Sequence, residues 1–354
     1  MKRTFLIGPY PPPYGGVSVF VYLLHKFLLR EGIDCKLKII RQQSNQEKEY
    51  VVPKFGSIFR HFHMLTKTDK CVDSGSFYLE YRSGWAPLAW MLLKFLRRFR
   101  WIKIIHDSSL PSRYKKYEFG RKLLVRYLMR HVDEFVVISE ELFKWLKCTI
   151  RVKQKVHLIK SLLPMPENEA FVSLPREIEQ RLAQHTKLVC SIGVFTPEYG
   201  FEHIAKAIEM VRWDSGQDIG LLLIDGGFVL EDFSEYKNRV VQNRGWIAVL
   251  EGMPHPEVLE ILKRCDVFVR GVASESYGVS RVESIWCGTP VIATPVGETK
   301  GMLIYEYGDV PALTTNLKQV LFQESRDKTF LWAAHFKREA EANLRSIVDV
   351  IAGV

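Results

Sequence analysis

Short runs of apolar, largely β-branched residues alternate along this chain with longer stretches in which apolar residues recur every three or four positions. The short runs are typical of buried strands and the longer stretches of amphipathic helices. Their alternation predicts βαβ units, in which helices connect the parallel strands of one sheet. The alternation occurs twice, so the sequence predicts an α/β protein with two Rossmann-like domains.

The predicted elements divide the chain near its middle. In the first half, strands are expected at 4–8, 35–40, 77–81, 102–106 and 134–138, and helices near 17–31, 86–99, 118–132 and 140–147. In the second half, strands are expected at 188–193, 220–225, 247–250, 267–270 and 291–294, and helices near 200–212, 256–264 and 279–287. The proline-rich, acidic stretch 163–174 is predicted to link domains at 1–163 and 175–327. The segment 328–354 is predicted to form a last helix that packs back on the first domain.

The length of 354 residues suits two domains of ordinary size. No segment approaches the ~18 uninterrupted apolar residues that a membrane-spanning helix needs. The apolar start of the chain is interrupted at Pro9, so we interpret it as a strand rather than a signal peptide. The six cysteines are widely spaced without a Cys-x-x-Cys pair, which favours neither a disulfide framework nor a zinc site and is typical of a reducing cytosol.

The formal net charge of +10 is unevenly distributed. Residues 1–165 contain 31 Lys and Arg against 13 Asp and Glu, a net +18, so the remainder carries −8. A basic half of this kind suits a polyanionic partner, either an anionic membrane surface or a nucleic acid. The alternative is that two solvated surfaces of opposite sign attract each other.

Two adjacent glycines follow the first predicted strand. Gly15 and Gly16 end a proline-rich turn and directly precede a helix expected from Val17. Glycines there allow close approach of a ligand to the backbone, and the free N–H groups of a helix start favour an anion. The alternative is a purely structural turn. Neither the glycine fingerprint of dinucleotide-binding domains nor a Walker lysine loop is present, which argues against dehydrogenases and nucleotide hydrolases.

Two glutamates flank the start of a predicted helix in the second half. Glu275 lies in a loop after the strand that ends at Arg270, and Glu283 lies early in the following helix. Both are expected at the carboxyl ends of parallel strands, where open α/β sheets bind ligands. Carboxylates accept hydrogen bonds from vicinal hydroxyls, so this pair suits a sugar and a ribose.

These motifs, together with the run Gly-Thr-Pro-Val-Ile-Ala-Thr-Pro-Val-Gly at 288–297, resemble the GT-B glycosyltransferases, specifically the large retaining family often called family four. The resemblance implies two Rossmann-like domains facing each other across a cleft, with a terminal helix that crosses back. It also implies that Glu283, with Gly278, Val279 and Arg281 around it, binds the donor nucleotide, that Glu275 contacts the donor sugar, and that Gly15 and Gly16 lie near the diphosphate. His106, at a strand end, resembles the histidine beside the donor sugar, although a lone histidine there also fits a structural role.

By the same resemblance, the expected reaction is a retaining, metal-independent hexosyl transfer. The donor would be a uridine- or guanosine-diphosphate sugar serving as co-substrate, with no other cofactor, and the acceptor a membrane-associated glycan or lipid, as in the synthesis of cell-surface polysaccharide or glycolipid. The leaving phosphate takes the acceptor proton in such enzymes, so no protein base is expected; Asp107 is the nearest alternative.

The sequence departs from this family at one place. Val194 and Tyr199 stand where members commonly carry the Arg and Lys that neutralise the donor diphosphate. A leaving diphosphate still requires a cation or a helix dipole, and Arg270 and Arg281 are the candidate substitutes, with Arg270 preferred as a catalytic residue. Two alternatives remain open: both arginines make structural ion pairs, or the chain is a catalytically degenerate homologue that binds sugar or acts as a scaffold.

Basic and aromatic residues are interleaved in the first half, in 94–103, 113–117 and 121–130. This composition suits the interface of an anionic membrane leaflet, and the alternative is a solvated surface over an apolar core. No recognisable nucleic-acid-binding module is present, so nucleic acid is not expected as a partner. The sequence therefore predicts a cytoplasmic protein, peripheral to the inner face of the membrane.

Overall fold

The computed structural model describes residues 4–12, 14–39, 69–74, 95, 99–165, 172–226, 233–323 and 327–353. Its contacts divide the chain into two units. Unit 1 comprises Met1–Pro11, Val17–Leu163 and Ala342–Val354, and unit 2 comprises Pro12–Gly16 and Pro164–Glu341. The predicted strand at 77–81 and nearly all of the predicted helix at 86–99 lie outside the described residues.

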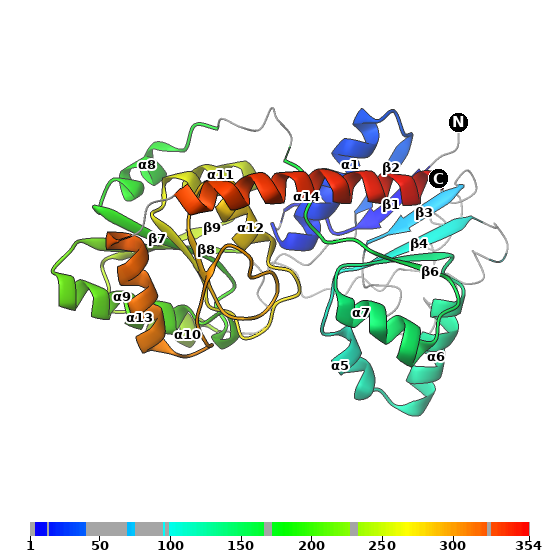
Figure 1. Ribbon diagram of the computed structural model, residues 1–354, viewed down its shortest axis with the longest axis horizontal. Coiled ribbons are helices and arrows are strands. Elements are labelled where there is room, and N and C mark those ends of the chain that lie inside the picture. Colours follow the sequence, from blue (N-terminus) through cyan, green and yellow to red (C-terminus); the bar gives the residue numbers. More distant parts are fainter. Residues whose placement is uncertain are drawn as a thin grey trace. The chain divides into compact units, whose positions relative to one another are not determined.

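Unit 1 is built on a parallel sheet (Figure 1). In the part of the chain that is described, its strands are β1 (Thr4–Gly8), β2 (Cys35–Ile39), β3 (Lys70–Asp73), β4 (Arg100–Ile105), β5 (Glu134–Val137) and β6 (Lys155–Leu158), in the spatial order β2-β1-β3-β4-β5-β6. Strands β3 and β6 were not predicted, because four-residue segments that begin with lysine carry too little apolar pattern. The other four agree with prediction within two residues at each end.

Helices connect these strands: α1 (Gly16–Arg30), α5 (Leu110–Lys115), α6 (Phe119–Arg130) and α7 (Glu140–Lys144), which continues as a π-helical turn (Trp145–Ile150). Helix α1 buries Phe20, Leu24 and Leu28, which are four residues apart and therefore share one face. Helix α7 begins at a cap in which Ser139 Oγ accepts from the Leu142 N–H at 3.3 Å. The core of the unit includes the fully buried Trp101, Phe135 and Met129.

Unit 2 contains a second parallel sheet. Its described strands are β7 (Lys187–Gly193), β8 (Ile219–Asp225), β9 (Ile247–Glu251), β10 (Val267–Arg270), β11 (Val291–Ala293) and β12 (Leu303–Ile304), in the order β12-β11-β10-β7-β8-β9. Its helices are α8 (Arg176–Leu182), a 3-10 turn (Pro197–Tyr199), α9 (Phe201–Ser215), α10 (Ser234–Val241), α11 (His255–Arg264), α12 (Val279–Trp286) and α13 (Val310–Phe322). This strand order is that of a doubly wound sheet, so the predicted α/β class with two parallel sheets is confirmed.

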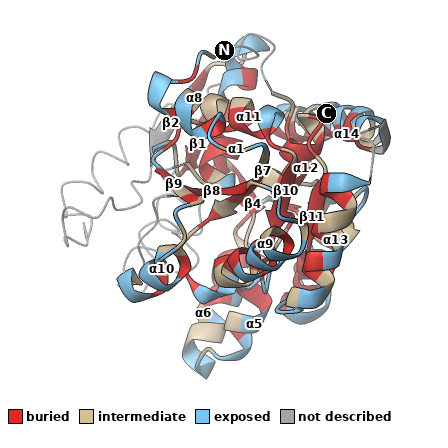
Figure 2. Cartoon of the chain, turned by 90° about the vertical axis from the view of Figure 1, so that its left-hand side faces the viewer, coloured by how far each residue is buried: buried red, intermediate tan, exposed pale blue. Residues whose placement is uncertain are grey.

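Burial follows the strands and the inner faces of the helices (Figure 2). In β8 every residue from Ile219 to Ile224 is buried, as expected for a central strand covered on both faces. Helix α9 buries Phe201, Ile204 and Ile208 in the same core. The strands therefore form a rigid frame, and the loops at their ends are free to carry function.

The last helix, α14 (Asp327–Ala352), contributes to both units. In unit 2, the Tyr277 hydroxyl donates to Glu339 Oε2 at 3.0 Å. In unit 1, Asn343 Nδ2 donates to the Leu162 carbonyl at 3.0 Å, and Lys70 Nζ donates to the Ile351 carbonyl at 2.7 Å near the end of the helix. A cation there interacts favourably with the helix dipole. None of the described helices combines the length and apolar character that crossing a bilayer requires.

Candidate functional site

The strand order of unit 2 reverses between β7 and β10. The chain runs outward from β7 to β8 and β9 on one side and from β10 to β11 and β12 on the other. In open α/β sheets, ligands bind outside the carboxyl ends of the two strands at which the order reverses. Here those ends are Gly193 and Arg270. The loops that follow them carry Tyr199 and Glu275.

Arg270 and Glu275 form an ion pair at this position. Arg270 Nη2 and Nε lie 2.6 and 2.9 Å from the same oxygen, Glu275 Oε2, and Nη1 donates to the Ile192 carbonyl. The side chains are 11% and 17% exposed. Burial raises the pKa of the Glu275 carboxyl, but the charge and hydrogen bonds of Arg270 outweigh it and hold the pKa below its usual value. The carboxylate is therefore ionised and oriented at neutral pH.

The ring of Tyr199 also packs against Arg270. The guanidinium carbon lies 4.9 Å from the centre of the Tyr199 ring, a cation–π arrangement. The ring occupies the space beside Gly193, where an added Cβ would stand only 2.1 Å from Tyr199 Cδ1. Gly193 is thus required for the close approach of the ring. Sequence reasoning identified Tyr199 only as a missing cation, because its stacking joins two segments that are 71 residues apart in the sequence.

Glu283 is held by a residue that sequence reasoning missed. His255 Nε2, at the start of α11, lies 2.7 Å from Glu283 Oε1, and both side chains are buried. The bond involves one carboxylate oxygen and not Oε2. A histidine before a proline carries no signal of this contact in the sequence, because the partner lies 28 residues away.

Gly278, Val279 and Arg281 form the start of α12. Gly278 caps the helix with φ 83°, a left-handed conformation that favours glycine, and Val279 is the first helical residue. Arg281 is fully buried beneath this turn, where its Nη1 donates to the carbonyls of Thr294 and Glu298, both at 3.3 Å, and of Val296. Among the described residues, its Nε and Nη2 have no hydrogen-bond partner.

Burial lowers the pKa of Arg281 to about 10, and the charge of Arg270 acts in the same direction while Glu275 opposes it. Arg281 therefore remains charged at neutral pH. Because the side chain is fully covered, it is not accessible to direct contact in this conformation, and its charge acts on its surroundings through its electric field. The N-terminus of α12 adds N–H groups and a positive dipole end above it.

His106 lies at the end of β4 in unit 1. Its Nε2 is 2.8 Å from Ser74 Oγ and its Nδ1 is 3.0 Å from Ser161 Oγ, while Phe20 packs edge-on against the ring. Burial, and secondarily the charge of Lys103, lowers the pKa of His106 to about 3. The imidazole is therefore neutral, and each of its nitrogens contacts a serine hydroxyl. These contacts suit a structural role, and the place of His106 beside a donor sugar stays a prediction.

Gly15, Gly16 and Asp107 are the other residues predicted in the first half. Gly16 begins α1, and an added Cβ there would meet nothing within 4 Å; Gly15 precedes it. Asp107, the alternative base, accepts from the Ser109 N–H at 2.8 Å and pairs with Arg113. In the described residues, no group of three or more His, Cys, Asp or Glu side chains is arranged to hold a metal ion.

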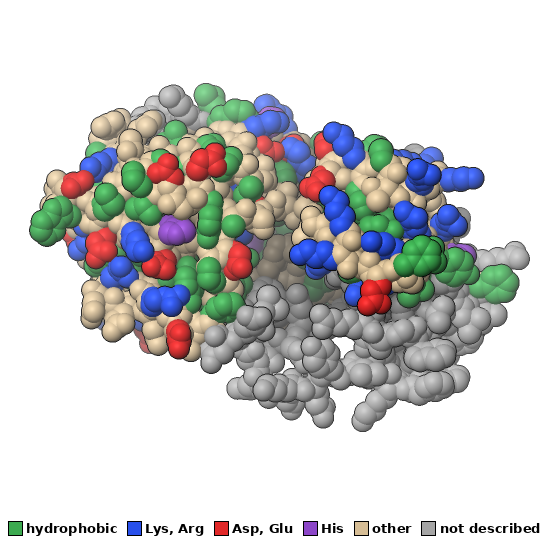
Figure 3. Space-filling model, turned by 90° about the horizontal axis from the view of Figure 1, so that it is seen from below, with side chains coloured by type: hydrophobic (Ala, Val, Ile, Leu, Met, Phe, Trp, Pro, Cys, Tyr) green, Lys and Arg blue, Asp and Glu red, His purple; other side chains and the backbone are tan. Residues whose placement is uncertain are grey.

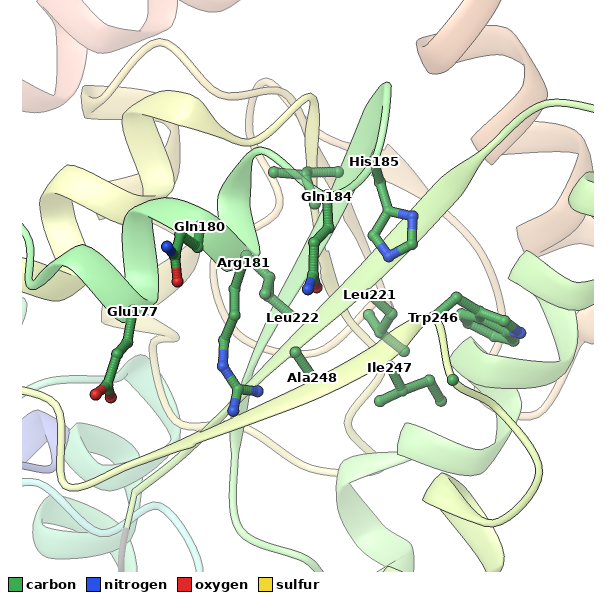
Figure 4. A pocket seen from close by; sticks show the side chains of 12 residues that line it. Glu177, Gln180, Arg181, Gln184, His185, Leu221, Leu222, Trp246, Ile247 and Ala248 are labelled. Atoms are coloured by element: carbon green, nitrogen blue, oxygen red, sulfur yellow. The ribbon is translucent and has the colours of Figure 1, made fainter.

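A separate hollow of about 390 Å³ lies between α8 and strands β8 and β9 (Figure 4). Arg181 of α8 and Gln184, in the turn that follows this helix, extend over Leu221, Leu222 and Ile247. These residues belong to the beginnings of β8 and β9, at the opposite end of the sheet from Arg270. The hollow is therefore distinct from the loops at the carboxyl ends of β7 and β10.

Comparison with known proteins agrees with this geometry. The family model for glycosyl transferases group 1 matches residues 176–310, which include β7, β10, α11 and α12. An uncharacterised glycosyltransferase of Methanocaldococcus jannaschii is 29% identical over 126 residues, which are 35% of this chain and 33% of that protein. The match thus spans about a third of the length of this curated relative.

Solved structures resemble nearly the whole chain. Sucrose-phosphate synthase of Thermosynechococcus elongatus has a TM-score of 0.68 at 18% identity, covering 98% of this chain and 94% of that one. HepE of Anabaena, in complex with UDP and glucose, has a TM-score of 0.73 at 12% identity over 100% of both chains. At these identities the likeness concerns the fold. The chain therefore has the GT-B fold of the glycosyltransferases, and its residues 176–310 match the group 1 family.

Proposed function

We propose that this protein is a glycosyltransferase that takes its sugar from a nucleoside-diphosphate donor at the carboxyl ends of β7 and β10. The observation that carries the proposal is the pair of oriented carboxylates beside the strand reversal. Glu275 is held by Arg270 in the loop before α12, and Glu283 is held by His255 within α12. A pair of fixed acceptors suits the hydroxyls of a sugar and a ribose, with the diphosphate over the helix start.

Charge compensation for the diphosphate comes, in this proposal, from Arg281 and α12. Glu275 neutralises the charge of Arg270, whereas Arg281 has no carboxylate bonded to it among the described residues. The cluster of Arg270, Glu275 and Arg281 therefore carries a net single positive charge. Preorganised charge and dipoles of this kind stabilise a leaving diphosphate without reorganisation. This assignment shifts the compensating role from Arg270 to Arg281.

The finer features of the reaction belong to the same proposal. They are a UDP- or GDP-linked donor, hexosyl transfer, retention of anomeric configuration and no requirement for a metal ion. Solved relatives were obtained with UDP-glucose in one case and with UDP-2-fluoro-glucose in another, which supports a uridine donor. The loss of the expected cations at Val194 and Tyr199 supports a second candidate, a degenerate homologue that binds sugar without transferring it.

The exposed side chains of helix α6 support the proposal that the acceptor lies at a membrane surface. Phe119, Leu123 and Tyr127, four residues apart on one face, are 77%, 49% and 49% exposed. Lys122, Arg126 and Arg130 form the neighbouring stripe of the helix. Figure 3 shows basic and hydrophobic side chains gathered on this part of the surface. Exposed rings beside cations suit an anionic lipid interface, so we place the protein at the cytoplasmic face of the membrane with a glycan or lipid-linked acceptor.

The experiment that tests the proposal is a thermal-shift and calorimetric screen of UDP- and GDP-sugars, followed by detection of the released nucleotide. Binding to the native state raises the melting temperature by mass action. Glu283→Gln should weaken nucleotide binding by roughly 1–3 kcal/mol, since a charged acceptor is lost. Binding without nucleotide release in the presence of candidate acceptors would favour the degenerate homologue, and no binding of any nucleotide sugar would overturn the proposed transferase.

A further inference from the structure

A hydrogen bond joins the side chains of His255 and Glu283, which belong to two different helices. His255 begins α11 and Glu283 lies in α12, on opposite sides of β10 in the sequence. Only 6% of His255 and 7% of Glu283 is exposed, and the Nε2 to Oε1 distance is 2.7 Å. The bond therefore fixes the Glu283 carboxylate from outside its own helix.

A fixed carboxylate differs chemically from a freely rotating one. A glutamate side chain turns about several bonds, and a ligand that binds a mobile one must also order it. Hydrogen bonds to an ionised carboxylate are short and strong, so one such bond suffices to restrict the rotation. The imidazole can donate from Nε2 in its neutral or its charged form. Because the hydrogen bond from His255 holds Oε1 of Glu283, the position of Oε2 in the same carboxylate is fixed as well.

We infer that His255 is a positioning residue that orients Glu283 to accept the ribose hydroxyls of the donor nucleotide. It thereby controls discrimination between ribose and deoxyribose without contacting the nucleotide. This inference rests on the proposed function, which assigns the ribose to Glu283.

A purely structural role for His255 predicts something different. Two other hydrogen bonds connect α11 with the end of α12 and the residues after it: Thr289 Oγ1 donates to the Leu262 carbonyl at 2.5 Å, and Cys287 Sγ lies 3.6 Å from the Leu259 carbonyl. Buried apolar side chains of both helices, including Leu262 and Ile285, add packing. The helices thus stay connected without His255, and a structural histidine would change stability but not the preference between two nucleotides.

The test compares UDP with 2′-deoxy-UDP, and GDP with its 2′-deoxy form, by calorimetry on the full chain. The wild type should bind the ribonucleotide about tenfold more tightly, as expected for a hydrogen bond to a charged acceptor. His255→Leu should reduce this ratio to below about threefold, with little change in the deoxynucleotide affinity. His255→Gln should retain the ratio, because its side-chain amide can still donate to Glu283. Thr289→Val is the matched control: it removes a bond between the same segments and should lower stability without changing the ratio.

The outcomes separate the inference from the function on which it rests. If the wild type binds no nucleotide, or binds the ribonucleotide and the deoxynucleotide of each pair equally, the assignment of ribose to Glu283 is overturned. The inference about His255 is then overturned with it. A wild type that discriminates, with a His255→Leu variant that discriminates equally, overturns only the role of His255. If His255→Leu does not fold, His255→Asn replaces it, because the shorter amide cannot reach Glu283 and should also reduce the ratio.

Discussion

Arg270 and Glu275 meet at the carboxyl end of β10, with Nη2 and Oε2 2.6 Å apart. The two side chains therefore act as a unit, although each had been expected to contact the donor independently. The pairing orients the carboxylate and neutralises the arginine. Removing either residue would therefore leave the charge of its largely buried partner uncompensated.

Arg270→Ala should lower both the melting temperature and the turnover, by about 2–4 kcal/mol in stability, because Glu275 then lacks its partner. Arg270→Lys should recover only part of the turnover, since an ammonium group cannot donate through both Nε and Nη2 positions. Steady-state kinetics and thermal unfolding measure the two effects. Combining Arg270→Ala with Glu275→Gln should cost less than the sum of the single changes. Additive losses of turnover would instead indicate that Arg270 acts on the diphosphate, separately from Glu275.

Gly193→Ala should destabilise the protein by roughly 1–3 kcal/mol, because the new methyl group collides with the Tyr199 ring. Adding Tyr199→Leu should relieve the collision and restore stability in part. Tyr199→Phe, which retains the ring face under Arg270, should be close to wild type in turnover. Thermal unfolding of the single and double variants measures the coupling. A fully stable Gly193→Ala protein with an unchanged Tyr199 would contradict the tight packing of these residues.

His106 should make the protein sensitive to acid. Its pKa is lowered to about 3 in the folded state, from 6.5 in the unfolded chain, so between these values the unfolded state binds the extra proton. The stability that the neutral imidazole provides is complete above pH 6.5 and decreases as the pH falls toward 3, by roughly 5 kcal/mol over the whole window. His106→Gln should flatten the dependence of melting temperature on pH in this window. Parallel profiles for the two proteins would show that another group is responsible.

Helix α6 should bind anionic vesicles through both of its exposed stripes. Replacing Lys122, Arg126 and Arg130 by Ser should weaken co-sedimentation with vesicles that contain an acidic phospholipid, at about 1 kcal/mol for each charge, most clearly at low salt. Phe119→Ser with Leu123→Ser should weaken it at any salt concentration. Trp213→Ser, which changes an 88% exposed aromatic residue in unit 2, is the control. Undiminished vesicle binding by the α6 variants would instead indicate that these residues form an ordinary solvated surface. Arg97 and Arg98, from the basic segment 94–103, lie outside the described residues.

The sequence alone determined the two parallel sheets, the loop that carries Glu275 and the helix that carries Glu283. Strands such as β8 and β10 are continuous apolar runs, and a buried strand needs no partner to be recognised. Short polar strands such as β6 escaped prediction, because pairing with β5 rather than local pattern makes them strands. The motif around Gly278 was also visible, since glycine at a helix start is a local signal.

Tertiary structure decided which of these residues act together. The contacts of Arg270 with Tyr199, of Glu283 with His255 and of Arg281 with the 294–298 loop join segments from 13 to 71 residues apart. No pattern in the sequence states such distances, because side-chain partners depend on how the strands are ordered in the sheet. The order places β10 next to β7, and this adjacency brings the ring of Tyr199, in the loop after β7, under Arg270. Composition could supply the charges, but only the fold determines which of them are neutralised.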